Sequence, residues 1–488
     1  MVTKKGSTGR LYPRVTLDVL PDNVLLETFE LYLGKDHADE WDHSYDGWQT
    51  LVHVCRRWRC IVFASPRRLD LKLYCTRQRL VNSKTMDIWP ELPIVIIAED
   101  MESREDVTNV IGALRHHNRV CKIYYRNWQF QDSFLKEFAA IDELFPALTT
   151  LKLLCFGQNV PVLPDSFLGG SAPCLRSLHL DGIPYPSMGK LLLSATNLVQ
   201  LSLSHIPHSG YIPPETIVPC LSMLPRLNSL FLGFQFPRSR AHRASRHPPP
   251  LTRVVFPNLT FLRFGGDIEY LEDFLSRIET PILTQSHFWF FNQLVFDTPL
   301  LGHFIRRTET FMTIHTAHVK FRSWDVMVTL SGLDREALKL KISCKPLDWQ
   351  LSALAQVLGS FLSSLPTLES LKITIHPSRN NWQGEIEVIQ WRELLHPFTK
   401  VMTLVLEDSV RLVAPALQEL AGERATGVLP TLQILFLRTN GRQPSGPVKE
   451  AIKQFIATRQ LHGHPVIVHY SQSPLKPYPS KAILSRTP

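Results

Sequence analysis

One spacing of apolar positions recurs along most of the chain. An apolar residue is followed by two variable residues, a second apolar residue, one variable residue and a third apolar residue, often with Pro just before the first. The clearest copies begin at Leu148, Leu175, Leu198, Leu227, Leu259, Leu368, Val401 and Leu432. When a single residue separates two apolar residues in a strand, both apolar side chains lie on the same face of that strand. The middle positions of adjacent clear copies lie 23 to 33 residues apart, which leaves room for one strand and one return helix or turn.

The repeat predicts an α/β solenoid. Weaker copies lie at residues 92–97, 120–125, 283–288, 314–319 and 338–340, and Val466 with Val468 is a candidate for the last strand. One unit cannot bury its own apolar face, so about a dozen units must stack. We expect parallel strands on the concave face, with helices such as 105–115, 134–143 and 351–362 on the convex face.

The spacing resembles the leucine-rich repeat in an irregular form, over about residues 90 to 470. The fixed Asn or Cys of the tight-turn version is mostly missing, so the loop after each strand must vary. The alternative is an α/β domain in which each copy is merely a buried strand, and this alternative has the same fold class.

Residues 20–62 follow a different pattern. Pro21 suits the first turn of a helix, and apolar side chains follow it at helical spacing up to Phe29. After an acidic loop at 34–47, residues 48–62 predict one helix or two short ones. About fifty residues give too little core to be stable alone, so a partner or the repeats must complete this module.

This module resembles an F-box. Leu20-Pro21, the run Val54-Cys55-Arg56-Arg57-Trp58-Arg59 and Ser65-Pro66 occur in the family's order. Two features depart from the family: the loop is longer and acidic, and Arg67 stands where a Trp commonly follows the Pro. The resemblance implies docking on the Skp-type adaptor of an SCF ubiquitin ligase and, through it, on a cullin. The positions it implies for this contact are Leu20, Pro21, Val24, Leu25, Leu51, Val54, Cys55 and Trp58. The alternative for the same residues is a small internal core.

The chain therefore divides into four predicted parts. They are a flexible N-terminus (1–16), the F-box-like helical domain (17–75), the repeat solenoid (76–470) and a disordered tail (471–488). A basic, Pro-rich stretch at 237–252 interrupts the repeats and predicts a protruding loop.

Composition limits the function classes. No apolar stretch approaches the roughly 18 residues that a membrane-spanning helix needs, and no secretory signal follows the polar start, which predicts a cytoplasmic or nuclear protein. The eight Cys are scattered without a C-x-x-C pair, which argues against a disulfide framework and a zinc module. The 53 Lys and Arg against 44 Asp and Glu give a net charge of +9, a weak sign of an acidic partner.

No catalytic residue, cofactor or metal site is expected. The segment 182–190 has six residues between its glycines, whereas a phosphate loop has four. His37 and His43 among the acids of the loop could hold a metal, but an acidic loop of this kind is more often simply solvated. The histidines at 116, 117, 242, 247, 462 and 464 lack a paired Cys or an H-E-x-x-H partner, and no G-x-S-x-G elbow is present.

The residues between the buried leucines form the predicted target surface. In a solenoid these side chains point out of the concave face. The candidates are Lys122, Tyr124, Lys152, His179, Phe231, Phe261, Arg263 and Lys372, a set without an acid that suits an acidic target segment. We therefore expect a non-catalytic ligase adaptor that binds an unknown target protein. The alternative is a repeat scaffold for protein or nucleic acid with no ligase link, although nucleic acid is the less expected partner.

Overall fold

The computed structural model divides the chain into two compact units, Met1–Tyr125 and Arg126–Pro488. It describes residues 19–33, 47–76, 91–99, 104–127, 133–155, 157, 160–185, 190–237, 252–333, 335–375, 388–407, 409–420, 427–439 and 446–472. The predicted flexible N-terminus, the tail after residue 472, the acidic loop except Gly47 and the basic loop between its end residues lie outside these ranges.

The first unit begins with three short helices, α1 (Asp22–Tyr32), α2 (Gly47–Val54) and α3 (Arg56–Ala64). Its other elements are β1 (Leu73–Thr76), β2 (Ile94–Glu99), α5 (Arg104–Leu114) and β3 (Val120–Asn127). The run 48–62 thus forms two helices, the second of the two options that the spacing leaves open. Phe29 and Val52 are at most 1% exposed in the small helical core. The indole of Trp48 donates to the Lys72 carbonyl at 3.1 Å, which ties α2 to the chain that enters β1.

The second unit alternates strands and helices. Its strands are β4 (Thr150–Cys155), β5 (Ser177–Asp181), β6 (Gln200–Ile206), β7 (Ser229–Phe234), β8 (Val254–Val255), β9 (Phe261–Gly266), β10 (Ile278–Glu279), β11 (Gln285–Phe290), β12 (Thr316–Phe321), β13 (Val326–Ser331), β14 (Glu336–Ile342), β15 (Ser370–Ile375), β16 (Thr403–Glu407), β17 (Ile434–Thr439) and β18 (Ile467–Gln472). Its helices are α6 (Ser133–Ala139), α7 (Lys190–Ser194), α8 (Pro214–Ser222), α10 (Ile268–Arg277), α11 (Pro299–Arg307), α12 (Glu309–Met312), α13 (Leu347–Gly359), α14 (Val388–Leu395), α15 (Val410–Leu420) and α16 (Pro447–Leu461). Short 3-10 turns lie at Phe167–Gly170, His208–Gly210 and Leu362–Ser364.

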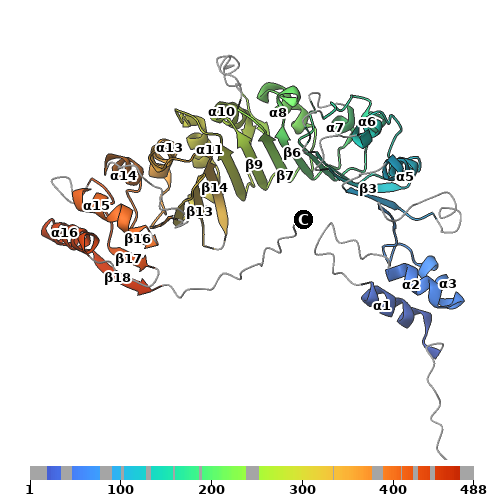
Figure 1. Ribbon diagram of the computed structural model, residues 1–488, viewed down its shortest axis with the longest axis horizontal. Coiled ribbons are helices and arrows are strands. Elements are labelled where there is room, and N and C mark those ends of the chain that lie inside the picture. The colour runs from blue at the N-terminus through green and yellow to red at the C-terminus, as the bar shows by residue number, and fades with distance from the viewer. Residues whose placement is uncertain are drawn as a thin grey trace, which may run out of the picture. The chain divides into compact units, whose positions relative to one another are not determined.

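The α/β class is confirmed, because thirteen described strands of the second unit form one mostly parallel sheet. Within the second unit the strand order is β4-β5-β6-β7-β9-β11-β14-β13-β12-β15-β16-β17-β18. The repeat copies lie side by side in this order, with Leu151 opposite Leu178 and Leu178 opposite Leu201. Figure 1 shows the helices of this unit along one side of its strands. The apolar positions of the repeat form the core on that side: Leu151, Leu178, Leu201, Leu230 and Leu262 are each at most 1% exposed.

The expectation of parallel strands throughout is wrong between β11 and β15. Strands β12, β13 and β14 form an antiparallel meander, so that β14 pairs with β11 and β12 pairs with β15. The physical reason is the absence of a return helix between these strands. Arg322 donates its amide to the Asp325 carbonyl at 2.9 Å in the first turn, and Gly332 donates to Arg335 at 3.1 Å in the second. Turns this short connect antiparallel neighbours, whereas parallel strands need a crossover of a dozen or more residues.

A ladder of short polar side chains links neighbouring repeats. Asn197 donates to the Pro173 carbonyl at 2.9 Å, and Asn258 donates to the Pro225 carbonyl at 2.8 Å. Thr431 plays the same part further along, where its hydroxyl reaches the Val401 carbonyl at 3.1 Å. All three precede the first apolar residue of their copy, so this position satisfies loop carbonyls that no strand partner reaches.

Helix α11 begins on a buried carboxylate of the preceding helix. Glu272 in α10 is 6% exposed and accepts from the amides of Leu300 at 2.8 Å and Leu301 at 2.7 Å. A carboxylate is favourable at a helix N-terminus, where amides lack an intrahelical partner. This contact holds the start of α11 against α10.

Candidate protein-interaction surfaces

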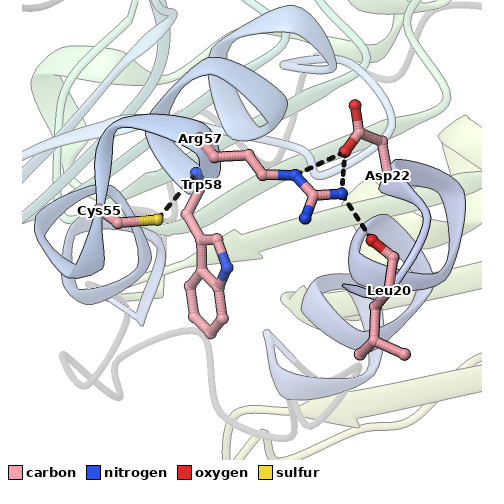
Figure 2. Close-up of polar contacts among 5 residues, drawn as sticks. All are labelled: Leu20, Asp22, Cys55, Arg57 and Trp58. Atoms are coloured by element: carbon pink, nitrogen blue, oxygen red, sulfur yellow. Dashed lines mark hydrogen bonds and ion pairs between the residues drawn. The ribbon is translucent and has the colours of Figure 1, made fainter. Parts of the chain in front are cut away.

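The starts of α1 and α3 are held together by one arginine. Arg57 donates to the Leu20 carbonyl at 2.5 Å, and its Nε and Nη2 donate to Asp22 at 3.0 and 2.6 Å (Figure 2). The Asp22 side chain is 68% exposed, so the ion pair contributes at most about 1 kcal/mol. Its effect is positional, because it sets the Leu20-Pro21 entry of α1 beside the beginning of α3.

Cys55 separates α2 from α3. Its extended backbone (φ −158°, ψ 169°) ends α2, and its Sγ accepts from the Trp58 amide at 3.4 Å as the N-cap of α3 (Figure 2). The Trp58 ring then packs against Phe29 of α1, with ring centroids 4.7 Å apart. The Val-Cys-x-x-Trp run therefore forms the corner that joins all three helices.

The eight residues that the F-box resemblance singles out fall into two groups. Leu25 and Leu51 are 1% and 5% exposed and belong to the internal core, so they differ from the expectation of a partner-facing position. Val24 and Val54 are 37% and 56% exposed. Of the others, Leu20, Cys55 and Trp58 are half-buried and Pro21 is exposed. Helical spacing alone could not separate these groups, because short helices that pack at a corner bury only part of each apolar stripe.

Three further apolar residues of α1 and its start lie in solvent. Val19, Leu31 and Tyr32 are 73%, 82% and 58% exposed. They extend the apolar surface to both ends of α1. The sequence contained this signal, since Leu31 and Tyr32 continue the apolar run beyond the face that Leu25 and Phe29 bury.

In the second unit, one row of outward side chains crosses the whole sheet. We call it the central row, because on most strands it lies between the two buried apolar positions of the repeat. Strand register places its members side by side in the order Lys152, His179, Ser202, Phe231, Arg263, His287, Lys339, Thr329, His318, Lys372, Val405, Phe436 and His469. The row holds four Lys or Arg and four His but no Asp or Glu, so its electrostatic potential favours anions.

The middle of the central row carries a packed cluster of Phe231, Arg263 and Trp289, which we call the arginine cluster. The Arg263 guanidinium lies 4.5 Å from the Phe231 ring centroid and 4.8 Å from that of Trp289. The two rings meet edge to face at 5.2 Å. Such contacts contribute roughly 0.5–2 kcal/mol each and hold the guanidinium in one orientation.

Two glycines make room for the indole of the arginine cluster. A Cβ on Gly265 would lie 1.9–2.3 Å from three Trp289 ring atoms, and one on Gly233 would lie 3.3 Å from the same ring. Trp289 therefore lies flat on the backbone of β9. Only glycine permits this approach, and the ring in turn supports Arg263.

Arg263 keeps an exposed guanidinium although its stem is packed. Burial lowers its pKa from the ordinary value, but an arginine stays charged in proteins. Within the described part of the chain, no carboxylate pairs with Arg263 or with Lys339 two strands away. Its donors are therefore available to an anion from outside.

The surroundings of two histidines of the row, His287 and His318, lower the pKa of their imidazoles. Burial lowers the pKa of His287, and the charges of Lys339 and Arg263 lower it further. Burial also lowers the pKa of His318, with Lys372 and Lys320 acting in the same direction. An anion bound here would favour the protonated imidazoles.

Acidic side chains beside the row are already occupied. Lys372 pairs with Glu407 at 2.5 Å, and Glu407 also accepts from Thr374 at 3.3 Å. Burial alone would raise the pKa of Glu407, but the hydrogen bond and charge of Lys372 hold it below its ordinary value. Asp181 pairs with His205 at 2.6 Å at the other end of the sheet, and this hydrogen bond raises the pKa of His205.

Most of the sequence-predicted target residues lie on the outward face of the sheet. Lys152, His179, Phe231, Arg263 and Lys372 belong to the central row, and Phe261 lies two residues before Arg263 with its ring 5.2 Å from that of His287. Lys122 and Tyr124 lie on β3.

Tyr124 differs from the expectation. It is 7% exposed and packs with Val95 and Ile97, since β2 and β3 have apolar residues on both faces. Spacing shows which residues share a face, but it does not show whether that face is covered.

Sequence reasoning missed Trp289, His287 and Lys339. The copy of the repeat on β11 is weak because Ser286 stands where a leucine is expected, although Leu283 and Phe288 keep the frame. That frame already places residues 287 and 289 on the outward face. The weak copy at 338–340 likewise places Lys339 outward, but the repeat does not predict the strand order of the meander that brings Lys339 beside His287.

The other chemical candidates add no site in the described residues. No group of three His, Cys, Asp or Glu there could hold a metal ion. The histidines at 37, 43, 242 and 247 and most of the turn after Tyr185 lie outside the described ranges. None of the described helices has the length and apolar character that crossing a membrane requires.

A scan of protein-family models matches none of them to this chain, and a search of curated proteins also finds no match.

Proposed function

We propose that the protein is a non-catalytic substrate adaptor of an SCF-type E3 ubiquitin ligase. In this proposal the N-terminal helices dock on the Skp-type adaptor, and the outward face of the sheet binds the protein to be ubiquitinated. Another subunit performs the thioester chemistry, so this chain needs no catalytic group. It acts by raising the effective concentration of the target at the ligase, in the cytoplasm or nucleus.

The observation that carries the proposal is the exposure of Val24 and Val54. Both lie at positions that the F-box resemblance assigns to the adaptor contact, and they are 37% and 56% exposed on α1 and α2. A helical module this small loses stability by leaving apolar side chains in water, unless a partner covers them. The Arg57 clamp supports the proposal further, since it orients the Leu20-Pro21 segment before any partner binds.

The sheet face supports the second half of the proposal. Arg and aromatic side chains are the residues that most often dominate protein interfaces, and the arginine cluster presents them in a fixed arrangement. A rigid anchor loses little conformational entropy when a partner binds.

Co-expression with a Skp-type adaptor followed by size-exclusion chromatography tests the proposal. We expect the wild-type chain to co-elute with the adaptor, and Val24→Asp and Val54→Asp to lose the complex while staying folded by circular dichroism. Leu461→Asp is the matched control, because Leu461 is 85% exposed at the end of α16 and far along the chain from the helical module.

A folded wild-type chain that forms no complex would contradict the ligase link. It would favour the scaffold alternative, in which the N-terminal helices serve only to close one end of the repeats.

A further inference from the structure

We propose that the central row binds an extended acidic segment of the target protein, with one side-chain oxyanion of that segment held by Arg263. This inference rests on the proposed function in one respect, namely that the outward sheet face is the target-binding surface. It adds the chemical class of the target and the residue that anchors it.

Arg263 has the features of an oxyanion anchor. Its guanidinium is held by two rings, one of which rests against Gly265, and it pairs with no described carboxylate. A planar guanidinium donates two parallel hydrogen bonds to a carboxylate or phosphate, and these charge-assisted bonds are about twice as strong as neutral ones. Stacking removes the rotamer freedom that a free arginine would lose on binding.

Further donors flank the anchor at strand spacing. His287 is the register partner of Arg263 on β11, and Lys339 is the partner of His287 on β14. Neighbouring strands lie about 4.8 Å apart, so the three side chains span about 10 Å of the sheet. This distance matches acidic side chains three or four residues apart in an extended segment, which advances about 3.3 Å per residue.

The whole row is long enough for a peptide of ordinary length. Lys152 and Lys372 are nine strand steps apart in the row, or about 43 Å at the usual strand spacing. A segment of about 13 extended residues would cover this distance. The four Lys and Arg of the row stand two to four strands apart, so the row matches a segment with spaced acids rather than a continuous polyanion.

The cluster favours protein over nucleic acid. Nonspecific binding of single strands relies on aromatic rings that are free to stack on bases. Here Arg263 covers both Phe231 and Trp289, and the β9 backbone at Gly265 lies against Trp289.

Fluorescence anisotropy with the purified full-length chain tests the inference. The first probe is a labelled 15-residue peptide of alternating Glu and Ser, and the second carries phosphoserine at its three central Ser positions. The controls are a Lys-Ser peptide and a 15-nucleotide single strand. We expect both acidic probes to bind and to compete with each other, and the tighter of the two identifies the oxyanion as carboxylate or phosphate.

Variants assign the binding to the row. Arg263→Gln should weaken the acidic probes at least tenfold, and Lys339→Gln should weaken them several-fold. Arg411→Gln on α15, which changes the same charge on an exposed helix position, should leave affinity within twofold of wild type. Lys339→Gln also keeps the test decisive if Arg263→Gln fails to fold.

Three results would overturn the inference. They are no binding of either acidic probe at millimolar concentration, equal loss in Arg411→Gln and Arg263→Gln, and tighter binding of the oligonucleotide than of both peptides. The outcome is independent of the ligase link, because this assay contains no adaptor. A chain that binds the peptides but not the Skp-type adaptor would keep this inference and refute the proposed function.

Discussion

A side chain added at Gly265 gives the sharpest test of the arginine cluster, because it would collide with the Trp289 ring. The substitution is Gly265→Ala, which adds one methyl group where the Trp289 ring lies 1.9–2.3 Å away. Carbon atoms need about 3.5 Å, so the indole must move by at least about 1.5 Å. That movement breaks the stacking of Arg263 and the contact with Phe231.

The expected magnitude follows from these contacts. Overpacking of this kind destabilises by about 1–3 kcal/mol. In a Trp289→Ala background the three nearest atoms are gone, and alanine is favoured over glycine within a strand by about 0.5–1 kcal/mol. Gly265→Ala should therefore change sign between the two backgrounds, with a coupling free energy of about 2 kcal/mol or more.

Urea denaturation of the four members of the cycle, followed by far-UV circular dichroism, measures this coupling. Gly359→Ala is the matched control, because a Cβ on Gly359 would meet no atom within 4 Å, and its effect should be the same in both backgrounds. An equal cost of Gly265→Ala with and without the indole would refute the packing that we describe.

Three other predictions concern single residues. Glu272→Ala should lower the free energy of unfolding by about 2–3 kcal/mol in urea denaturation, because two buried α11 amides lose a charged acceptor, whereas a cost below about 0.5 kcal/mol would contradict this role. The raised pKa of His205 means that its pairing with Asp181 stabilises the fold below about pH 6.5 and that this contribution is lost as pH rises through the folded-state pKa. Because the imidazole side chain is 54% exposed, the effect is at most about 0.5 kcal/mol, and it should vanish in denaturation curves of His205→Asn, which also suits the left-handed backbone (φ +46°). Burial and two nearby carboxylates raise the pKa of the Cys344 thiol to about 12, so iodoacetamide should label exposed Cys174 in the native protein and Cys344 only after unfolding, as read by mass spectrometry; equal labelling would contradict this burial.

The sequence predicted the repeat because its signal is steric and local. Alternating leucines at a fixed interval can be buried only by stacking strands, and the copies from Leu151 to Leu262 do lie side by side in register. The same reasoning failed at β12 to β14, where short turns replace the return helix. Apolar and polar residues alternate in these strands as regularly as elsewhere. Only the short chain length between the strands indicated that they are antiparallel.

The outward placement of the central row was predicted in outline, but the packing of the arginine cluster was not. The frame of the repeat assigned Arg263 and Phe231 to the outward face. It did not predict that Trp289 would lie across Gly265, because that contact depends on the absence of a side chain on a neighbouring strand. In the helical module, burial of Leu25 and exposure of Val24 depend on how α1 meets α2 and α3, which spacing does not determine.

Simultaneous binding of two partners tests the central claim most directly. A Skp-type adaptor is immobilised on a biosensor surface, the full-length chain is captured on it, and the tighter acidic peptide is then injected over the complex. We predict stable capture of the chain, followed by a further saturable peptide signal that Arg263→Gln removes without affecting capture. Failure of the folded wild-type chain to be captured, or loss of capture whenever the peptide binds, would contradict a protein that holds ligase and target at once.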